Sequence, residues 1–127
     1  YNQLRLIELL KCIVDIHYEN FRQTGIYEKI ANLTVPLNYK EQDELEMVIE
    51  IHFNIFIHNL RCLIPAITKK EILICCLSFR FSMQTIGLCL GYTSTNTVRQ
   101  HKIRIKRKML YKHESNYVFD FIFCNSG

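Results

Sequence analysis

Hydrophobic residues recur at steps of three and four along most of the chain, which is the pattern of amphipathic helices. Near the N-terminus the pattern covers residues 2 to 21, and Gly25 interrupts it. A short helical segment follows over residues 26 to 32, and Pro36 then marks a loop, because the residue before a proline avoids the helical conformation. The first forty residues therefore predict two helices.

A longer helix is predicted after this loop. Asn38 followed by Glu41 resembles a capped helix start, and the next residues are rich in acids, which suit the positive N-terminal end of a helix dipole. The hydrophobic pattern continues to about Leu63, and Pro65 closes the helix. We expect one continuous helix over this range.

The segment after Pro65 has clearer boundaries. Thr68 and Glu71 form a Thr-x-x-Glu capping box ahead of an apolar run, which predicts a helix from Thr68 to about Phe79. This helix is the first of three closely spaced helices.

Short turns separate the second and third of these helices. Ser82 is placed to cap a helix from Met83 to Leu90, and Gly91 stands where glycine commonly ends one. A third helix is predicted from about Thr97 to Leu110, preceded by four residues that can cap it: Thr93, Ser94, Thr95 and Asn96.

Composition agrees with a helical globular protein. The 127 residues are 49% hydrophobic and 22% charged, enough to bury one sizeable core, and they include only 2 Pro and 4 Gly. We therefore predict an all-α fold in which an N-terminal helical bundle, residues 1 to 67, packs separately from a three-helix unit that begins at residue 68. The apolar tail over residues 117 to 123 should pack on the helical core, and a dimer contact is the alternative use.

The cysteines and histidines predict no chemical site. Most of the six cysteines lie inside apolar helical runs, which favours buried, reduced thiols and a cytoplasmic location. We find no Cys-x-x-Cys pair, nucleophile with its base, paired carboxylates or glycine-rich loop, so we expect no metal, cofactor, catalytic residue or small-molecule substrate. Three histidines are expected in the helical core: His17, His52 and His58.

Charge divides the chain at residue 67. Residues 1 to 67 carry 9 acids and 6 bases, whereas residues 68 to 127 carry 3 acids and 10 bases. Seven of these bases fall within fourteen residues that include no acid: Arg99, Lys102, Arg104, Lys106, Arg107, Lys108 and Lys112. An ordinary solvated surface is one interpretation, but such a surface usually interleaves acids as ion-pair partners. The run favours a polyanion as the partner.

The third helix presents this charge on one side. At about 100° per residue, Val98, Ile105 and Met109 share a core face, with His101 at its edge. Positions on the remaining surface near the helix start are suited to touch base edges in DNA, because Arg pairs with guanine, Asn or Gln with adenine, and an aliphatic side chain with the thymine methyl. These candidates are Asn96, Arg99, Gln100 and Ile103.

A second group of side chains is suited to phosphates, which position a protein on DNA without reading its sequence. This group is Ser82, Thr93, Ser94, Thr95, His101, Lys102, Arg104, Lys106 and Arg107. Helix capping is an equally good role for the hydroxyls, and His101 is equally well explained as a packed core histidine.

Four short segments carry a family resemblance in their order and spacing. They are Thr68-Lys69-Lys70-Glu71, the run from Ser82 to Gly91, Thr97-Val98-Arg99-Gln100-His101, and Arg107-Lys108-Met109. Together they resemble the LuxR-type helix-turn-helix, and they are similar to the fourth region of bacterial sigma factors. The resemblance spans residues 68 to 110, roughly a third of the chain. It implies sequence-specific binding of double-stranded DNA with the third helix in the major groove.

The same resemblance implies a wider context. The chain would belong to a bacterial transcription regulator, with residues 1 to 67 as a regulatory, dimerisation or spacer region. It would be the cytoplasmic output end of a larger, membrane-anchored signalling protein. RNA polymerase and a second copy of the chain are the further candidate partners.

Two alternatives remain open from the sequence. A helical protein–protein adaptor would use the same basic helix to dock an acidic partner. RNA binding is the weaker alternative, because the third helix has no aromatic residues on which splayed bases could stack.

Overall fold

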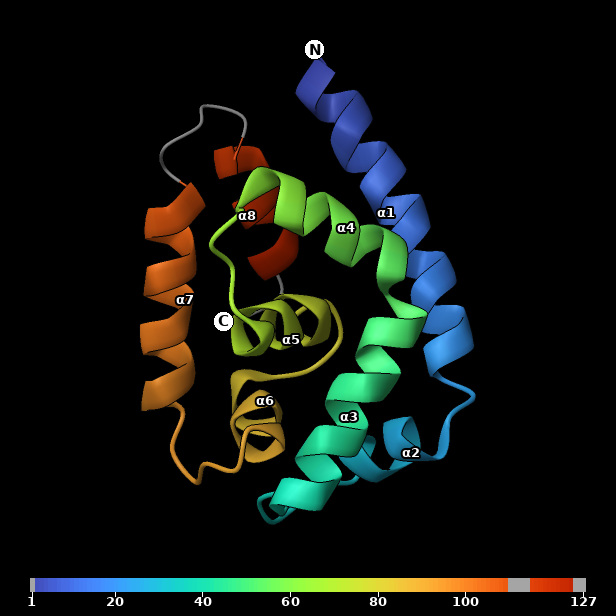
Figure 1. Cartoon of the computed structure of the whole chain (residues 1–127), viewed down its shortest axis with the longest axis vertical. Helices are drawn as coiled ribbons and strands as arrows, with labels where there is room; N and C mark the ends of the chain where they lie inside the picture. Colours follow the sequence, from blue (N-terminus) through green and yellow to red (C-terminus); the bar gives the residue numbers. More distant parts are fainter. Residues whose placement is uncertain (1, 110–114, 125–127) are drawn as a thin grey trace.

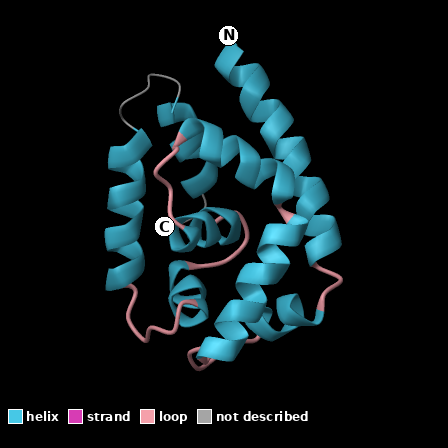
Figure 2. Ribbon diagram, viewed as in Figure 1, coloured by secondary structure: helices cyan, strands magenta, loops and turns pink. Residues whose placement is uncertain are grey.

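The computed structural model describes residues 2–109 and 115–124, and α-helix is the only regular structure in those two ranges (Figures 1 and 2). The predicted all-α class is confirmed. The helices are α1 (Asn2–Phe21), α2 (Gly25–Ala31), α3 (Tyr39–His52), α4 (Asn54–Leu63), α5 (Lys69–Leu77), α6 (Met83–Cys89), α7 (Asn96–Met109) and α8 (Ser115–Phe123). Leu110, the predicted end of the third helix of the unit, and Lys112 lie outside the described residues.

The predicted helix starts are confirmed where a capping side chain was recognised. Asn38 caps α3 and Thr68 caps α5, and in both cases the glutamate three residues later completes the capping box. Ser82 caps α6 by accepting a hydrogen bond from the Thr85 backbone N–H at 3.2 Å. These features were predictable because each involves residues only three positions apart.

The long helix predicted over residues 38 to 63 is wrong. It is two helices, because Phe53 leaves the helical conformation with φ −109° and ψ 24°. The Phe53 ring is buried and packs edge-on against Tyr18 of α1, with their centroids 5.0 Å apart. Beside it, the Phe56 backbone N–H donates to Nε2 of His17, also on α1, at 3.3 Å. Packing against α1 therefore explains a break that no proline or glycine marks.

Helix α5 lies in the middle of the molecule (Figure 1). Every residue from Glu71 to Phe79 is buried, and α3, α7 and α8 all pack against this helix. A helix surrounded on all sides needs no polar face, which explains its unbroken apolar run. Because α5 touches both halves of the chain, its position fixes α7 relative to the N-terminal helices.

The two halves share one hydrophobic core instead of forming two separately packed units. A single cluster of buried side chains runs from Leu10 in α1 to Phe123 in α8. The Tyr18 hydroxyl donates to the backbone carbonyl of Cys76 and so ties α1 to α5. The Leu37 backbone N–H donates to the Leu88 carbonyl at 2.9 Å and ties the α2–α3 loop to α6. Residue 67 therefore separates an acidic from a basic half of the sequence, but it does not separate two hydrophobic cores.

The apolar tail forms α8 and packs on α1, α5 and α7, as predicted. Its buried side chains are Val118, Phe119, Ile122 and Phe123. Among the described helices, none combines the length and the apolar character needed to cross a membrane.

Cysteines and histidines are less buried than expected. All six cysteines are free, with Cys75, Cys76 and Cys89 buried, but the other three are exposed: Cys12, Cys62 and Cys124. His17 is buried, His52 is half-buried, and His58 is exposed beside Cys62 on α4. The prediction of a core position therefore fails for His58, whose side chain points away from the buried Phe56 side of α4.

Candidate nucleic-acid interface

Helix α7 forms one edge of the molecule, with its outer side away from the other helices (Figure 1). Val98, Ile105 and Met109 are buried, as the sequence predicted, and hold the inner side against α5, α6 and α8. With its inner face fixed on three helices, α7 presents its outer side chains from a rigid support.

The start of α7 is set by the turn that follows α6. Gly91 has φ +89°, a left-handed conformation that glycine adopts readily, and lets the chain turn away from α6. The Asn96 backbone N–H donates to the Ser94 hydroxyl at 3.2 Å and supports the first turn of α7. Helix α6 approaches this region closely, since a Cβ placed on Gly87 would lie 3.4 Å from the Ser94 carbonyl oxygen.

Lys108 clamps the other end of α7 to α5. Its ammonium donates to Oε1 of Glu71 at 2.6 Å and to the carbonyl of Ala66 at 3.1 Å. Glu71 is buried at 2% exposure and also accepts from the Thr68 backbone N–H at 2.8 Å. The Glu71 carboxylate thus takes part both in the capping box of α5 and in the contact with α7. Lys108 is therefore an exception to the expectation that the basic run forms no ion pairs.

The titratable groups on this side reflect their burial. Burial by itself would raise the pKa of Glu71, but the hydrogen bonds from Lys108 and Thr68 bring its pKa below the ordinary value, so it stays ionised at pH 7. Burial also lowers the pKa of His101, and the nearby Arg104 lowers it further. His101 is half-buried at the α5 side of α7 and is neutral at pH 7.

Two predicted phosphate-contacting lysines lie along the α8 side of α7. The ammonium of Lys102 is 5.2 Å from the centre of the Phe123 ring, and that of Lys106 is 5.3 Å from the centre of the Phe119 ring. Burial, followed by the neighbouring charge of Lys106, lowers the pKa of Lys102. Lys102 is half-buried whereas Lys106 is exposed, so Lys106 is the more accessible of the two to a partner.

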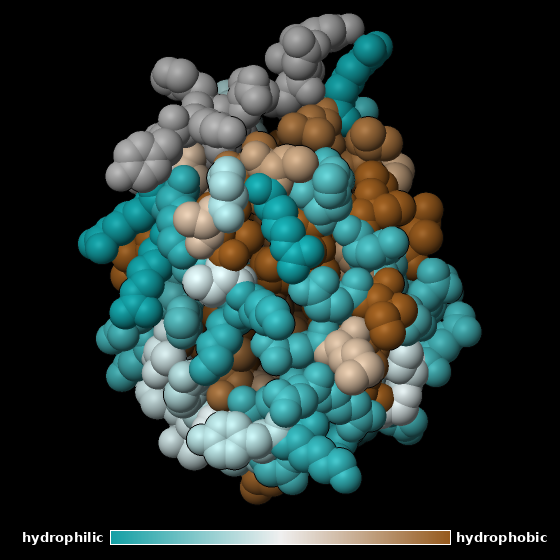
Figure 3. Space-filling model, in the orientation of Figure 1, coloured by the Kyte–Doolittle hydropathy of each residue, from teal (hydrophilic) through white to brown (hydrophobic). Residues whose placement is uncertain are grey.

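The remaining outer surface of α7 is basic and polar, and no acid occurs between Asn96 and Met109. Figure 3 shows long hydrophilic side chains projecting from the edge that α7 forms. Among the predicted contact residues, the exposed ones on this helix are Asn96, Arg99, Gln100, Ile103, Arg104, Lys106 and Arg107. All four predicted base-contacting residues are thus accessible, and Ile103 is 52% exposed among charged neighbours.

The hydroxyl groups predicted to contact phosphates had two possible roles, helix capping and phosphate binding. Ser82 and Ser94 both accept backbone hydrogen bonds at helix starts, so the capping role is present for both. Each is nevertheless exposed, as is Thr93, whereas Thr95 is half-buried. These hydroxyls cluster around the N-terminal ends of α6 and α7.

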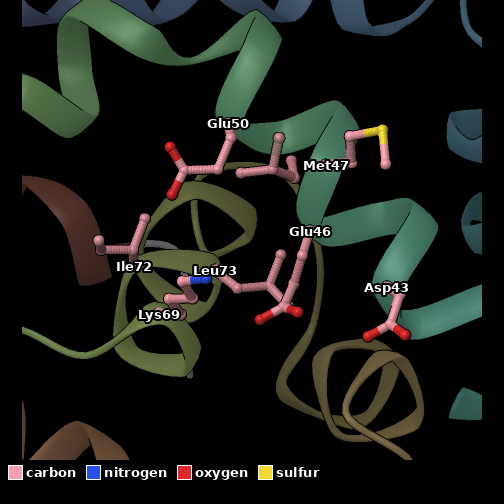
Figure 4. A pocket seen from close by; sticks show the side chains of 8 residues that line it. Asp43, Glu46, Met47, Glu50, Lys69, Ile72 and Leu73 are labelled. Carbon is pink, nitrogen blue, oxygen red and sulfur yellow. The ribbon is translucent and has the colours of Figure 1, made fainter.

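The surface beyond α5 and α6 has the opposite charge. Figure 1 shows α3 and α7 on opposite sides of these two helices. Between α3 and α5 lies a pocket of about 220 Å³, lined by Asp43, Glu46 and Glu50 of α3 and by Lys69, Ile72 and Leu73 of α5 (Figure 4). Three acids of α3 therefore lie on the side of α5 that faces away from the basic outer face of α7.

Lys108 and the second role of Glu71 were missed by the sequence reasoning. The capping box placed Glu71 at the start of α5, but nothing local linked it to a residue 37 positions later. A helical projection would have helped, since Lys108 lies one residue from the buried Met109 and three from the buried Ile105.

Within the described ranges, no three His, Cys, Asp or Glu side chains gather in a way that could hold a metal ion. Comparison with known proteins finds no matching family model, curated protein or solved structure.

Proposed function

We propose that this chain binds double-stranded DNA sequence-specifically, with α5, α6 and α7 acting as a helix-turn-helix and α7 entering the major groove. The observation that carries the proposal is the outer face of α7, which is exposed, basic and free of acids, while the inner face is fixed on three helices. The neighbouring α6, joined to α7 by the turn at Gly91, is the helix that would contact the DNA backbone.

The dimensions and chemistry of α7 suit this role. A helix with its side chains is about 10–12 Å wide and fits the major groove, which is about 12 Å wide. In this binding mode, residues near the helix start reach base edges. Asn96, Arg99 and Gln100 occupy that end of α7, and Ile103 follows one turn later with an apolar surface for a thymine methyl.

Positive charges further along the helix would hold the phosphates. Arg104, Lys106 and Arg107 are exposed in the second half of α7. The exposed hydroxyls at the starts of α6 and α7 would add contacts from the opposite end. Such contacts release counterions and make binding weaken as salt rises.

The sequence resemblance to LuxR-type helix-turn-helix units supports the same function and extends it. On that basis we propose a role in bacterial transcription regulation, in the cytoplasm, as part of a larger signalling protein and with RNA polymerase as a further partner. An adaptor that docks an acidic protein is the competing function, and the half-exposed Ile103 within the basic face is the observation that favours it.

The proposal is tested by selecting bound sequences from random duplex DNA with the purified chain and then measuring affinities by fluorescence anisotropy. On the selected site, Arg99→Ala should weaken the free energy of DNA binding by about 1–3 kcal/mol. It should also relax the preference for particular bases at one or two base pairs. Lys106→Ala should weaken the selected and scrambled duplexes equally and reduce the salt slope by about one. Lys40→Ala, which removes an exposed lysine of α3, is the matched control and should change neither.

A polyglutamate peptide serves as the probe for the adaptor function. If random DNA yields no enriched motif and the peptide binds as tightly as duplex DNA, the adaptor replaces the proposal made here. Equal losses on selected and scrambled duplexes for Arg99→Ala would remove that residue from the set that reads sequence.

A further inference from the structure

The outer side of α3 carries apolar side chains that the core does not use. Leu45 and Ile49 form the buried side of this helix. On the opposite side, Met47 is 64% exposed and Ile51 is 63% exposed. Ile55, which is 50% exposed, continues the row at the start of α4. Three large apolar side chains thus follow one another at four-residue steps and face the solvent.

Acidic side chains flank this apolar row. At about 100° per residue, Asp43 and Glu46 lie on one side of the row and Glu44 lies on the other. Within the described part of the chain, none of these three forms an ion pair, whereas Glu50 of the same helix is paired with Arg61 at 2.8 Å. Three carboxylates beside the apolar row are therefore open to the positive charges of a partner.

A furrow runs along one side of the row. The pocket of about 220 Å³ between α3 and α5 shares Asp43, Glu46 and Leu73 with a second hollow of about 180 Å³, which continues to Tyr39. Figure 4 shows Glu46 pointing toward α5 and Met47 pointing away from it. Long basic side chains of a helix lying on the apolar row can enter this furrow and reach its carboxylates.

The charges of α3 indicate which class of partner fits. Lys40, in the first turn, is the one lysine or arginine of this helix. Lipid phosphates and nucleic acids are negatively charged, so the carboxylates along α3 make them unfavourable occupants. A protein helix with an apolar stripe between rows of lysine or arginine matches both the apolar row and the acids beside it.

We propose that the outer side of α3 docks a basic amphipathic helix of another protein. Its apolar side chains lie on Met47 and Ile51, and its basic side chains contact Asp43, Glu44 and Glu46. From the first turn of α3 to Ile51 the surface is about 18 Å long at 1.5 Å per residue, which accommodates about three turns of a partner helix.

The position and size of this surface set two expectations. Figure 1 shows α3 and α7 on opposite sides of α5 and α6, so the docking of a helix on α3 leaves the outer face of α7 uncovered and does not depend on DNA binding. A contact with a single helix buries less than the roughly 800 Å² per partner of a standard interface, so the dissociation constant should be about 10 µM or higher.

A synthetic helical peptide serves as the probe. It has about 18 residues, enough to populate a helix, with leucines at three- and four-residue steps and lysines on both sides of them. In fluorescence anisotropy at low salt it should bind the chain at least roughly 10-fold more tightly than a peptide of the same composition in scrambled order. Equal binding of the two peptides would show attraction between charges alone and would overturn the proposal.

Charge reversal tests where the peptide binds. Asp43→Lys and Glu46→Lys should each weaken its binding by about 3- to 10-fold, because each places a like charge against the peptide lysines. Glu8→Lys reverses an exposed acid of α1, changes the net charge by the same amount, and should alter binding by less than about twofold. Equal losses for all three variants would refute a site on α3.

Polar replacements test the apolar row. Met47→Ser and Ile51→Ser should each weaken peptide binding by roughly 5- to 10-fold while leaving the circular dichroism spectrum unchanged, since both side chains lie outside the core. Ile16→Ser alters a comparably exposed residue of α1, at 62% exposure, and should leave peptide binding intact. If Met47→Ser and Ile51→Ser bind the peptide as the wild type does, the apolar row is not the docking surface.

Sedimentation equilibrium tests a second copy of the chain as the occupant. At the highest concentration used with the peptide, the wild-type chain should be monomeric. Self-association that Asp43→Lys abolishes would assign this surface to a second copy and overturn the proposal. All peptide measurements are made without DNA, so a chain that selects no duplex sequence contradicts the proposed function and leaves this test unaffected.

Discussion

Replacing Lys108 by Met should destabilise the fold more than its place on a basic helix suggests. The ammonium lies 2.6 Å from Oε1 of Glu71, a carboxylate that is only 2% exposed. Methionine keeps the length of the side chain but removes the charge and both hydrogen bonds. The carboxylate then remains buried, with the Thr68 backbone N–H as its other hydrogen bond.

The size of the effect follows from what each partner loses. Removing one member of a buried ion pair costs about 3–5 kcal/mol, because it leaves an uncompensated charge. Here Glu71 keeps the Thr68 contact, and the Lys108 side chain is 30% exposed in the wild type, so we expect about 2 kcal/mol. Glu71→Gln should lower the free energy of unfolding by about 1 kcal/mol. The amide oxygen can still accept the hydrogen bond from the Thr68 backbone N–H, and the Lys108 ammonium can be hydrated instead.

The dependence on pH separates this explanation from a simple loss of packing. In the wild type the pKa of Glu71 in the folded state lies below its ordinary value of 4.5. Its ionised form therefore stabilises the fold above pH 4.5, and this stability is lost as pH falls through the folded pKa. Without Lys108 the carboxyl loses a partner that lowers its pKa, while the burial that raises the pKa remains, so it should protonate in the folded state at a higher pH than in the wild type. The cost of Lys108→Met should therefore be largest at pH 7 and smaller at pH 4.5.

Urea unfolding followed by circular dichroism at pH 7 and pH 4.5 measures these differences; the chain has no tryptophan for a fluorescence signal. Arg107→Met changes the adjacent, exposed base and should stay within about 0.5 kcal/mol of the wild type. The reasoning is refuted if Lys108→Met costs no more than Glu71→Gln at pH 7, or if its cost is the same at both pH values.

Further predictions concern the α6–α7 turn and the α1–α4 contact. Gly91→Ala should destabilise the fold by about 1–2 kcal/mol, because φ is +89° and a Cβ would lie 2.7 Å from Nε2 of Gln42. Gly87→Ala should be neutral or slightly stabilising, since its Cβ would make ordinary contacts of 3.4 and 3.6 Å with Ser94 and Val98; a clear loss in thermal unfolding would contradict this packing. Burial, followed by the nearby charge of His52, lowers the pKa of His17 below its ordinary value of 6.5. As pH drops below 6.5, the imidazole is therefore protonated in the unfolded chain before it is protonated in the fold, and the fold should lose stability. His17→Gln keeps an acceptor for the Phe56 N–H without titrating, and should reduce the loss in urea midpoint between pH 7.5 and 5.5; an unchanged loss would exclude His17 as its source.

Local signals in the sequence determined the helical class and most of the helix boundaries. The caps at Asn38, Thr68 and Ser82 each depend on a side chain and a backbone N–H three residues away, so they could be recognised without the rest of the fold. The period of the third helix likewise predicted its buried side, at Val98, Ile105 and Met109, and from that the exposure of Arg99 and Ile103.

Tertiary packing decided what these short-range signals do not contain. The break at Phe53 depends on α1, where His17 accepts a hydrogen bond from a residue 39 positions later in the chain. The central place of α5 and the use of Lys108 as a clamp likewise require partners from distant helices. Helix caps and hydrophobic periodicity depend on residues within one or two turns of the helix. The position of a buried carboxylate or aromatic ring depends instead on hydrogen-bond and packing partners that are distant in sequence. For that reason the sequence indicated which face of α7 is basic, while the three-dimensional structure decided which of its charges remain accessible to a partner.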